Sequence, residues 1–196
     1  MKKLLALALV ALMAGGASAQ MYDGANMFGM FFSNTDFSEA STNHVNAFAP
    51  FNGYIVLLNS EVASIGGYEV GISISDPGVF VLAASGPNGW TNFGNNTNHL
   101  CGYMTALPCS GDADNFAVLG QLQMLYTGMN TVSISYGPAS PSSFDNMGPG
   151  IAEGSNPDNL VLCHPTTPDG IVATINGNGV VATENHTLTS VKALFE

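Results

Sequence analysis

Apolar and polar residues alternate along residues 68–75, and this alternation is the feature that most constrains the fold. The apolar positions that would share one side of an extended chain are Tyr68, Val70, Ile72 and Ile74. Successive side chains of a β-strand point to opposite faces, so the pattern predicts a strand with one buried face. Asp76-Pro77-Gly78 then supplies the residues of a tight turn.

Other short apolar or alternating segments predict further strands, and turn residues separate them. These segments are residues 27–32, 54–58, 79–83, 116–125, 131–136, 160–163, 171–175 and 180–181. No long segment has the apolar spacing of a surface helix, and residues 188–195 fit either a short helix or a final strand. About eight or nine short strands predict an all-β, antiparallel, immunoglobulin-like sandwich.

Two connections are longer than a hairpin requires, and we expect any functional site to lie in them. They run from Trp90 to Asn115 and from Gly137 to Asn159. Long loops in a compact domain commonly carry function.

The N-terminal residues have the layout of a secretory signal peptide. Lys2 and Lys3 precede an apolar run over residues 4–13, and small residues at 17–19 precede Gln20. The apolar run is too short for a membrane-spanning helix, which needs about twenty residues.

We therefore divide the sequence into a signal peptide, residues 1–19, and a single domain, residues 20–196. We expect a secreted or otherwise extracytoplasmic protein that does not insert into a membrane.

The excess of acidic residues limits the classes of partner that the protein can bind. The sequence has fourteen acidic residues against three lysines, and Lys192 is the one basic residue beyond the predicted signal peptide. Nucleic acids and anionic lipids are held by basic side chains, so both are excluded as partners. Neutral ligands such as glycans, cations and proteins remain.

Three cysteines are an odd number for an oxidising compartment. The segment between Cys101 and Cys109 contains a glycine and a proline and can close a small loop, so we expect these two to form a disulfide. Cys163 lies in an apolar run and fits a buried free thiol, although pairing with either of the others stays open.

Three aromatic residues form a candidate ligand-binding site. Trp90 and Tyr103 lie on either side of an asparagine-rich stretch, residues 92–98, and Phe93 lies within it. Aromatic faces can stack on sugar rings while amides bond hydroxyl groups, which would suit a neutral glycan. Trp90 equally fits a core or loop anchor.

Asp112, Asp114 and Asn115 form a candidate metal site. We expect no other cofactor. Calcium prefers such clusters of oxygen ligands, but the spacing lacks a distal bidentate glutamate. Asp and Asn in turns also bond their own backbone, so both interpretations stay open.

Catalytic patterns are absent from the sequence. No Gly-x-Ser-x-Gly motif occurs, and His44, His99, His164 and His186 are not at a spacing that places two on one face of a helix or strand. A hydrolase would need two carboxylates, or a serine and a histidine, to converge through the fold.

The order of the predicted strands resembles that of cohesin-like bacterial extracellular sandwiches. The resemblance lies in residues 51–59 and 65–74, with residues 115–125 and 131–136 following in similar order. It implies an immunoglobulin-like sandwich. The two-cysteine segment and the C-terminal extension depart from a compact cohesin, so dockerin binding is not carried over.

The ending at residues 191–195 also resembles that of bacterial secreted proteins with this layout, which implies no activity. Taken together, the sequence favours an exported, non-catalytic β-sandwich that binds a partner or forms part of a cell surface or extracellular assembly. A carbohydrate-binding module is the first alternative and a secreted hydrolase the second.

Overall fold

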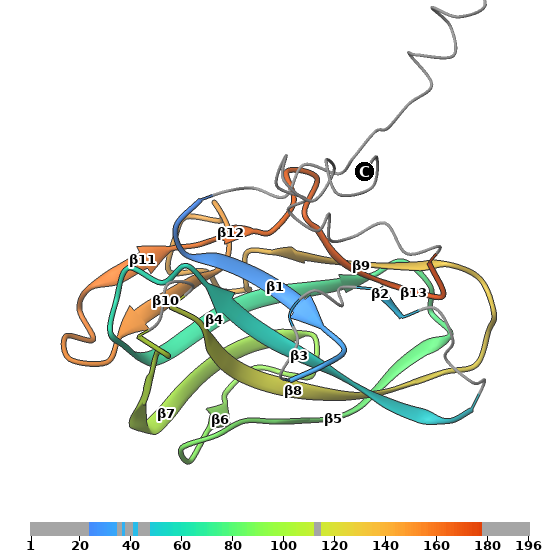
Figure 1. Ribbon diagram of the computed structural model, residues 1–196, viewed down its shortest axis with the longest axis horizontal. Helices are drawn as coiled ribbons and strands as arrows, with labels where there is room; N and C mark the ends of the chain where they lie inside the picture. Colours follow the sequence, from blue (N-terminus) through green and yellow to red (C-terminus); the bar gives the residue numbers. More distant parts are fainter. Residues whose placement is uncertain (1–23, 35–36, 38–40, 43–47, 112–114, 178–196) are drawn as a thin grey trace, which may run out of the picture.

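The computed structural model describes residues 24–34, 37, 41–42, 48–111 and 115–177, and these form two β-sheets packed face to face (Figure 1). The described residues contain no helix, and the pairings are antiparallel except for β1 with β12 and β13 with β2. The predicted all-β sandwich is confirmed.

One sheet has five strands in the order β12-β1-β3-β8-β5. Their bounds are β1 Met27–Phe31, β3 Pro50–Leu58, β5 Val79–Ser85, β8 Ala117–Tyr126 and β12 His164–Pro165. Strand β3 begins four residues earlier than the sequence predicts, because Pro50 already pairs with Leu125 of β8.

The other sheet has eight strands, with β11-β10-β4-β9-β13-β2 as its main path. On the other side of β4 lies β7, which also pairs with β6. The bounds are β2 Ser41–Thr42, β4 Ser64–Ile74, β6 Thr91–Asn92, β7 Asn98–Pro108, β9 Val132–Gly137, β10 Gly150–Glu153, β11 Leu160–Leu162 and β13 Ile171–Ile175.

The core lies between the two sheets and is built by the alternation in the strands. Phe28 of β1 meets the edges of two rings from the opposite sheet, with ring centroids 6.3 Å from Tyr68 and 6.5 Å from Tyr136. From β8, Leu122 and Met124 are fully buried in the same cluster. The predicted inward face of β4 is confirmed at Tyr68, Val70 and Ile72.

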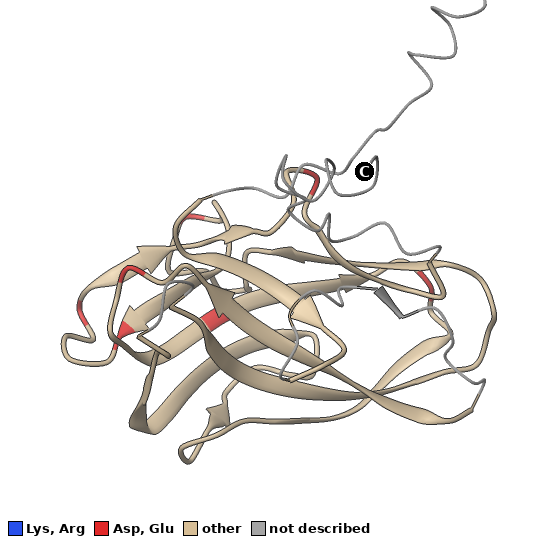
Figure 2. Ribbon diagram, in the orientation of Figure 1, with Lys and Arg blue, Asp and Glu red and all other residues tan. Residues whose placement is uncertain are grey.

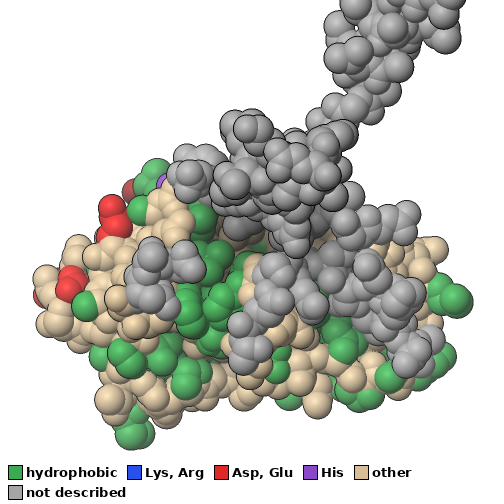
Figure 3. Space-filling model, in the orientation of Figure 1, with side chains coloured by type: hydrophobic (Ala, Val, Ile, Leu, Met, Phe, Trp, Pro, Cys, Tyr) green, Lys and Arg blue, Asp and Glu red, His purple; other side chains and the backbone are tan. Residues whose placement is uncertain are grey.

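The five-stranded sheet also buries apolar side chains on its other face. Met27, Phe31, Val56 and Leu58 form this second cluster. Apolar side chains gather beside β1 and β3 on the face seen in Figure 3. Both faces of β1 are therefore buried, which explains why its sequence shows no alternation.

Both predicted long loops contain strands, and in this respect the expectation was wrong. Residues 98–108 form the eleven-residue strand β7, and residues 150–153 form β10. β7 escaped the sequence pattern because a histidine, His99, occupies one of its buried positions. The interval 138–149 remains a loop between β9 and β10.

Several expected features lie outside the described residues. These are the signal peptide, the predicted strand at residues 180–181 and the C-terminal segment at residues 188–195. Within the part of the chain that the structure describes, no helix has the length and apolarity to cross a membrane.

The sandwich core predicts a clear difference between two leucines. Leu122 is fully buried between the sheets, whereas Leu82 on β5 is 48% exposed. Leu122→Ala should lower the free energy of unfolding by about 2 to 5 kcal/mol, because it removes buried methyl groups and leaves a cavity. Leu82→Ala should change it by less than about 0.5 kcal/mol. Urea denaturation measures both, and equal effects would contradict the described core.

Candidate functional site

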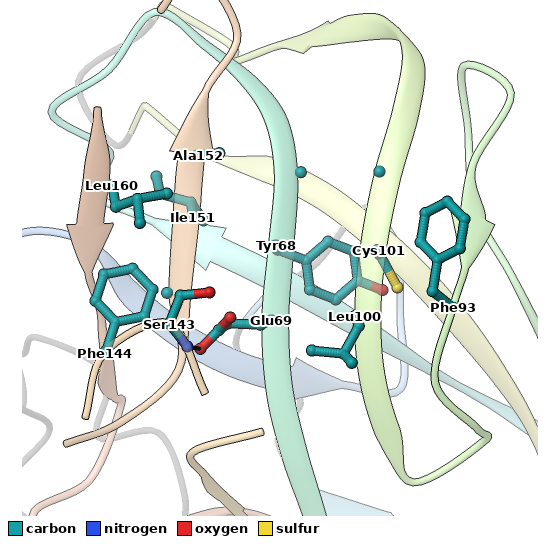
Figure 4. A pocket seen from close by; sticks show the side chains of 13 residues that line it. Tyr68, Glu69, Phe93, Leu100, Cys101, Ser143, Phe144, Ile151, Ala152 and Leu160 are labelled. Carbon is teal, nitrogen blue, oxygen red and sulfur yellow. Dashed lines mark hydrogen bonds between the residues drawn. The ribbon is translucent and has the colours of Figure 1, made fainter. Parts of the chain in front are cut away.

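A pocket opens on the outer face of the eight-stranded sheet, where β10, β4 and β7 lie side by side (Figure 4). Ala152, Gly67 and Gly102 form one row across the three strands. The next row is Gly150, Glu69 and Leu100. Side chains at the positions between these rows point into the core, so the outer face has a shallow, largely glycine floor.

We call this feature the outer-face pocket. It has a volume of about 290 Å³. Its full lining is Gly67, Tyr68, Glu69, Phe93, Leu100, Cys101, Gly102, Ser143, Phe144, Gly150, Ile151, Ala152 and Leu160. Phe93 stands on one side, and Phe144 and Leu160 stand on the other (Figure 4).

Close packing forces Gly67 to be glycine, and it leaves no room for a side chain at Gly150 unless the Phe144 ring moves. A Cβ atom on Gly67 would lie 2.5 Å from the carbonyl oxygen of Cys101, and one on Gly150 would collide with the Phe144 ring. Gly102 differs, since the nearest atom to its Cβ position is a Phe93 ring carbon at 3.9 Å. The sheet therefore tolerates a side chain at Gly102, and that side chain would stand in the pocket.

Glu69 places a carboxylate in the pocket. The residue is 8% exposed, and its Oε1 accepts hydrogen bonds from the Ser143 backbone N–H at 2.8 Å and the Ser142 hydroxyl at 3.1 Å. Figure 4 shows the carboxylate directed toward Ser143. Donors from the described residues reach Oε1 and leave Oε2 without a hydrogen bond.

The loop at residues 138–149 forms one side of the pocket and is held at two points. Glu69 bonds it at Ser142 and Ser143, and Asn98 of β7 bonds both backbone groups of Ser140. The Asn98 amide donates to the Ser140 carbonyl at 2.8 Å and its oxygen accepts from the Ser140 N–H at 2.8 Å. The loop is therefore positioned by both β4 and β7.

Among the described residues, acidic side chains occur without basic ones. The described residues contain no lysine or arginine, and their acidic residues are spread singly over the fold (Figure 2). Charged side chains are rarely buried without a partner of opposite charge. Glu69 meets only neutral donors from the described residues.

A buried polar network lies beneath the pocket, on the inner face of the same strands. The Trp90 Nε1–H donates to the Tyr68 hydroxyl at 3.2 Å, and that hydroxyl is 2.9 Å from Nδ1 of His99. His99 is 1% exposed, and burial lowers its pKa to about 4. The histidine is therefore neutral at pH 7, and the Tyr68 hydroxyl can donate to its Nδ1.

The structure places the three aromatic residues of the candidate ligand site in different surroundings. Trp90 packs against the core and donates its indole N–H to the Tyr68 hydroxyl. Tyr103 also packs against the core, and its hydroxyl donates to the Leu119 carbonyl at 2.6 Å. Phe93 alone stands on the surface, where it is 77% exposed and lines the outer-face pocket. A stacking face for a glycan would need Trp90 exposed beside one of the others.

The structure does not bring Cys101 and Cys109 together, and the expected disulfide is not formed. Cys101 pairs with Tyr68, whereas the Cys109 N–H donates to the carbonyl of Ala63. These positions are five residues apart in the partner segment, or about 16 Å, and a disulfide tolerates a Cα separation of at most about 7 Å. All three cysteines, including the buried Cys163, are free thiols.

The candidate calcium site falls partly outside the described residues, since Asp112 and Asp114 are not described. Asn115 is described and has a positive φ of 35°. Its amide donates to the carbonyl of Ser60, and its side-chain oxygen accepts from the Gly111 N–H at 3.0 Å. Asn115 thus has the backbone-bonding role that the sequence left open beside metal binding.

Metal-binding arrangements are also missing from the part of the chain that the structure describes. No group of three or more His, Cys, Asp or Glu side chains there could hold a metal ion. Glu69 is the one carboxylate that lines the outer-face pocket. Burial raises the pKa of Cys101 to about 12, so this lining cysteine stays a protonated thiol rather than a nucleophile.

Comparison with known proteins gives matches to cohesin modules only at the level of structure. No protein-family model and no curated protein matches the chain. The sixth cohesin of scaffoldin B from Acetivibrio cellulolyticus, solved in complex with a Cel5 dockerin mutant, is 9% identical with a TM-score of 0.46. That match covers 78% of this chain and 99% of the cohesin.

A second match is the second type II cohesin module of the ScaA adaptor scaffoldin from the same organism. It is 11% identical, with a TM-score of 0.48, and the match covers 80% of this chain and 99% of the module. The weak cohesin-like resemblance seen in the strand order is thereby confirmed.

His99 predicts a pH dependence of stability. Its pKa is about 4 in the folded protein and about 6.5 in the unfolded chain. The unfolded state therefore binds a proton first as the pH falls, so stability is lost between pH 6.5 and 4, by about 3 kcal/mol.

Urea denaturation at a series of pH values measures this loss in the wild-type and His99→Gln proteins. Carboxylate titration is common to both and cancels in the difference. An unchanged slope in His99→Gln would contradict a buried neutral histidine.

Proposed function

We propose that this protein is an exported, non-catalytic binding module that holds a segment of a protein partner in the outer-face pocket. The observation that carries the proposal is the pocket itself. It is a concave, mostly apolar surface on a sheet face, with one carboxylate among its lining residues. Binding sites have this composition of apolar walls and few polar groups.

The walls of the pocket favour a partner that brings apolar side chains. Phe93 is 77% exposed and Leu160 is 48% exposed, and they stand on opposite sides of the glycine floor. Large apolar side chains left in water at the rim of a pocket mark a binding surface, because covering them with a partner lowers the free energy. A protein segment can place apolar side chains against both walls.

Charge supports a protein rather than a polyanion. The described residues offer no lysine or arginine to a phosphate or sulfate group, and the one ionisable side chain that lines the pocket apart from Cys101 and Tyr68 is a carboxylic acid, Glu69. A neutral glycan finds less support, because Trp90 and Tyr103 are half-buried against the core and use their polar groups in hydrogen bonds within the protein.

The sequence supports export. A basic start, a short apolar run at residues 4–13 and small residues at 17–19 form a secretory signal pattern. A binding module in this setting would act at the cell surface or as part of an extracellular assembly.

Filling the pocket tests the proposal. Gly102→Leu places a side chain over the floor, and its Cβ atom has room because the nearest atom to that position is 3.9 Å away. Gly137→Leu is the matched control, since nothing lies within 4 Å of its Cβ position and it does not line the pocket. A library of displayed random peptides is selected on the immobilised wild-type protein.

Peptides enriched on the wild-type protein should bind Gly102→Leu at least about tenfold more weakly, because a tenfold loss requires only about 1.4 kcal/mol and the new side chain occupies the site. They should bind Gly137→Leu normally. Fluorescence anisotropy with labelled peptides measures the affinities. Failure to enrich any peptide, or equal binding to both variants, would contradict the proposed function.

A further inference from the structure

We propose that Glu69 makes the outer-face pocket selective for a lysine or arginine side chain of the protein partner. The inference rests on the proposed function and adds the chemistry of recognition to it. The cationic head would meet the free oxygen of the Glu69 carboxylate, and the apolar stem would lie against the pocket walls.

The Glu69 side chain is buried without a cationic partner among the described residues. Glu69 is 8% exposed, and its two hydrogen bonds come from an uncharged hydroxyl and a backbone N–H. A carboxylate removed from water loses much of its solvation, and a cation restores part of that loss. The described residues contain no lysine or arginine that could supply it.

The two oxygens of Glu69 have separate roles. Oε1 accepts both hydrogen bonds from the loop at residues 138–149, at Ser142 and Ser143, and so positions that loop. Oε2 accepts none from the described residues, yet it is not among the fully buried unpartnered atoms. A group in the pocket can therefore reach Oε2 while the loop stays bonded to Oε1.

The surroundings of Glu69 suit a long basic side chain more than a small cation. Leu100 lies beside Glu69 in the strand register, and Phe93 and Phe144 stand on the two sides of the pocket. Lysine and arginine carry apolar stems that pack on such surfaces while the charged head remains bonded. A guanidinium group can also lie against an aromatic ring.

The affinity difference between charged and neutral probes tests the proposal. Peptides enriched on the wild-type protein should share one lysine or arginine next to apolar residues. Replacing that arginine by citrulline keeps its shape and removes its charge. Binding should weaken at least about tenfold, because a charge-assisted hydrogen bond to a shielded carboxylate is lost. Lysine is replaced by norleucine in the same assay.

Glu69→Gln supplies the protein side of a double-mutant cycle. Glutamine keeps an oxygen that accepts from Ser142 and Ser143, so the loop should stay in place. This variant should weaken binding of the arginine peptide as much as the citrulline replacement does. It should not weaken binding of the citrulline peptide further. Glu153→Gln is the control, since Glu153 bonds Ser155 and Asn159 and does not line the pocket.

The possible outcomes test the inference and the proposed function separately. Enriched peptides that lose binding to Gly102→Leu but carry no basic residue would overturn the inference and leave the function standing. Additive effects of Glu69→Gln and citrulline would also overturn it, because the two groups would then not interact. If Glu69→Gln fails to fold, the citrulline comparison on the wild-type protein still decides.

Discussion

Close backbone contact on the outer face of β4 is the constraint on which the rest of the structure depends. A Cβ atom on Gly67 or Gly71 would collide with the carbonyl oxygen of Cys101 or Pro138, so neither position accepts a side chain. On the other face of the same strand, Tyr68 and Val70 fill the core. One strand thus fixes the packing of the sandwich and leaves a bare surface outside it.

The bare surface becomes a pocket because neighbouring segments rise on both sides of it. Phe93 follows the short strand β6, and Phe144 lies in the loop between β9 and β10. Glu69 is the outward residue of β4 between the two glycines, and it holds that loop through Ser142 and Ser143. The same carboxylate therefore shapes the site and gives it charge.

Local patterns predicted the sandwich, whereas the site depends on distant contacts. The alternation at residues 68–75 identified β4 and its buried face, and a strand with one buried face leaves Glu69 on the opposite face, where the pattern gives no reason to expect burial. Glu69 is buried by a loop more than 70 positions later in the chain. Strand β7 was missed because His99 becomes a core residue only through its bond with Tyr68. The sequence allowed Trp90 to be a ligand-binding residue or an anchor against the core. Its N–H donates to the same Tyr68 hydroxyl, which is the role of an anchor.

Mapping a bound peptide onto the protein by amide chemical shifts tests the central claim most directly. The account predicts that the largest shifts on titration fall at Gly67, Gly102 and Ser143, which line the outer-face pocket. Shifts centred instead on β5, where Phe80 and Leu82 are also exposed, would place recognition at the edge of the other sheet and contradict the account.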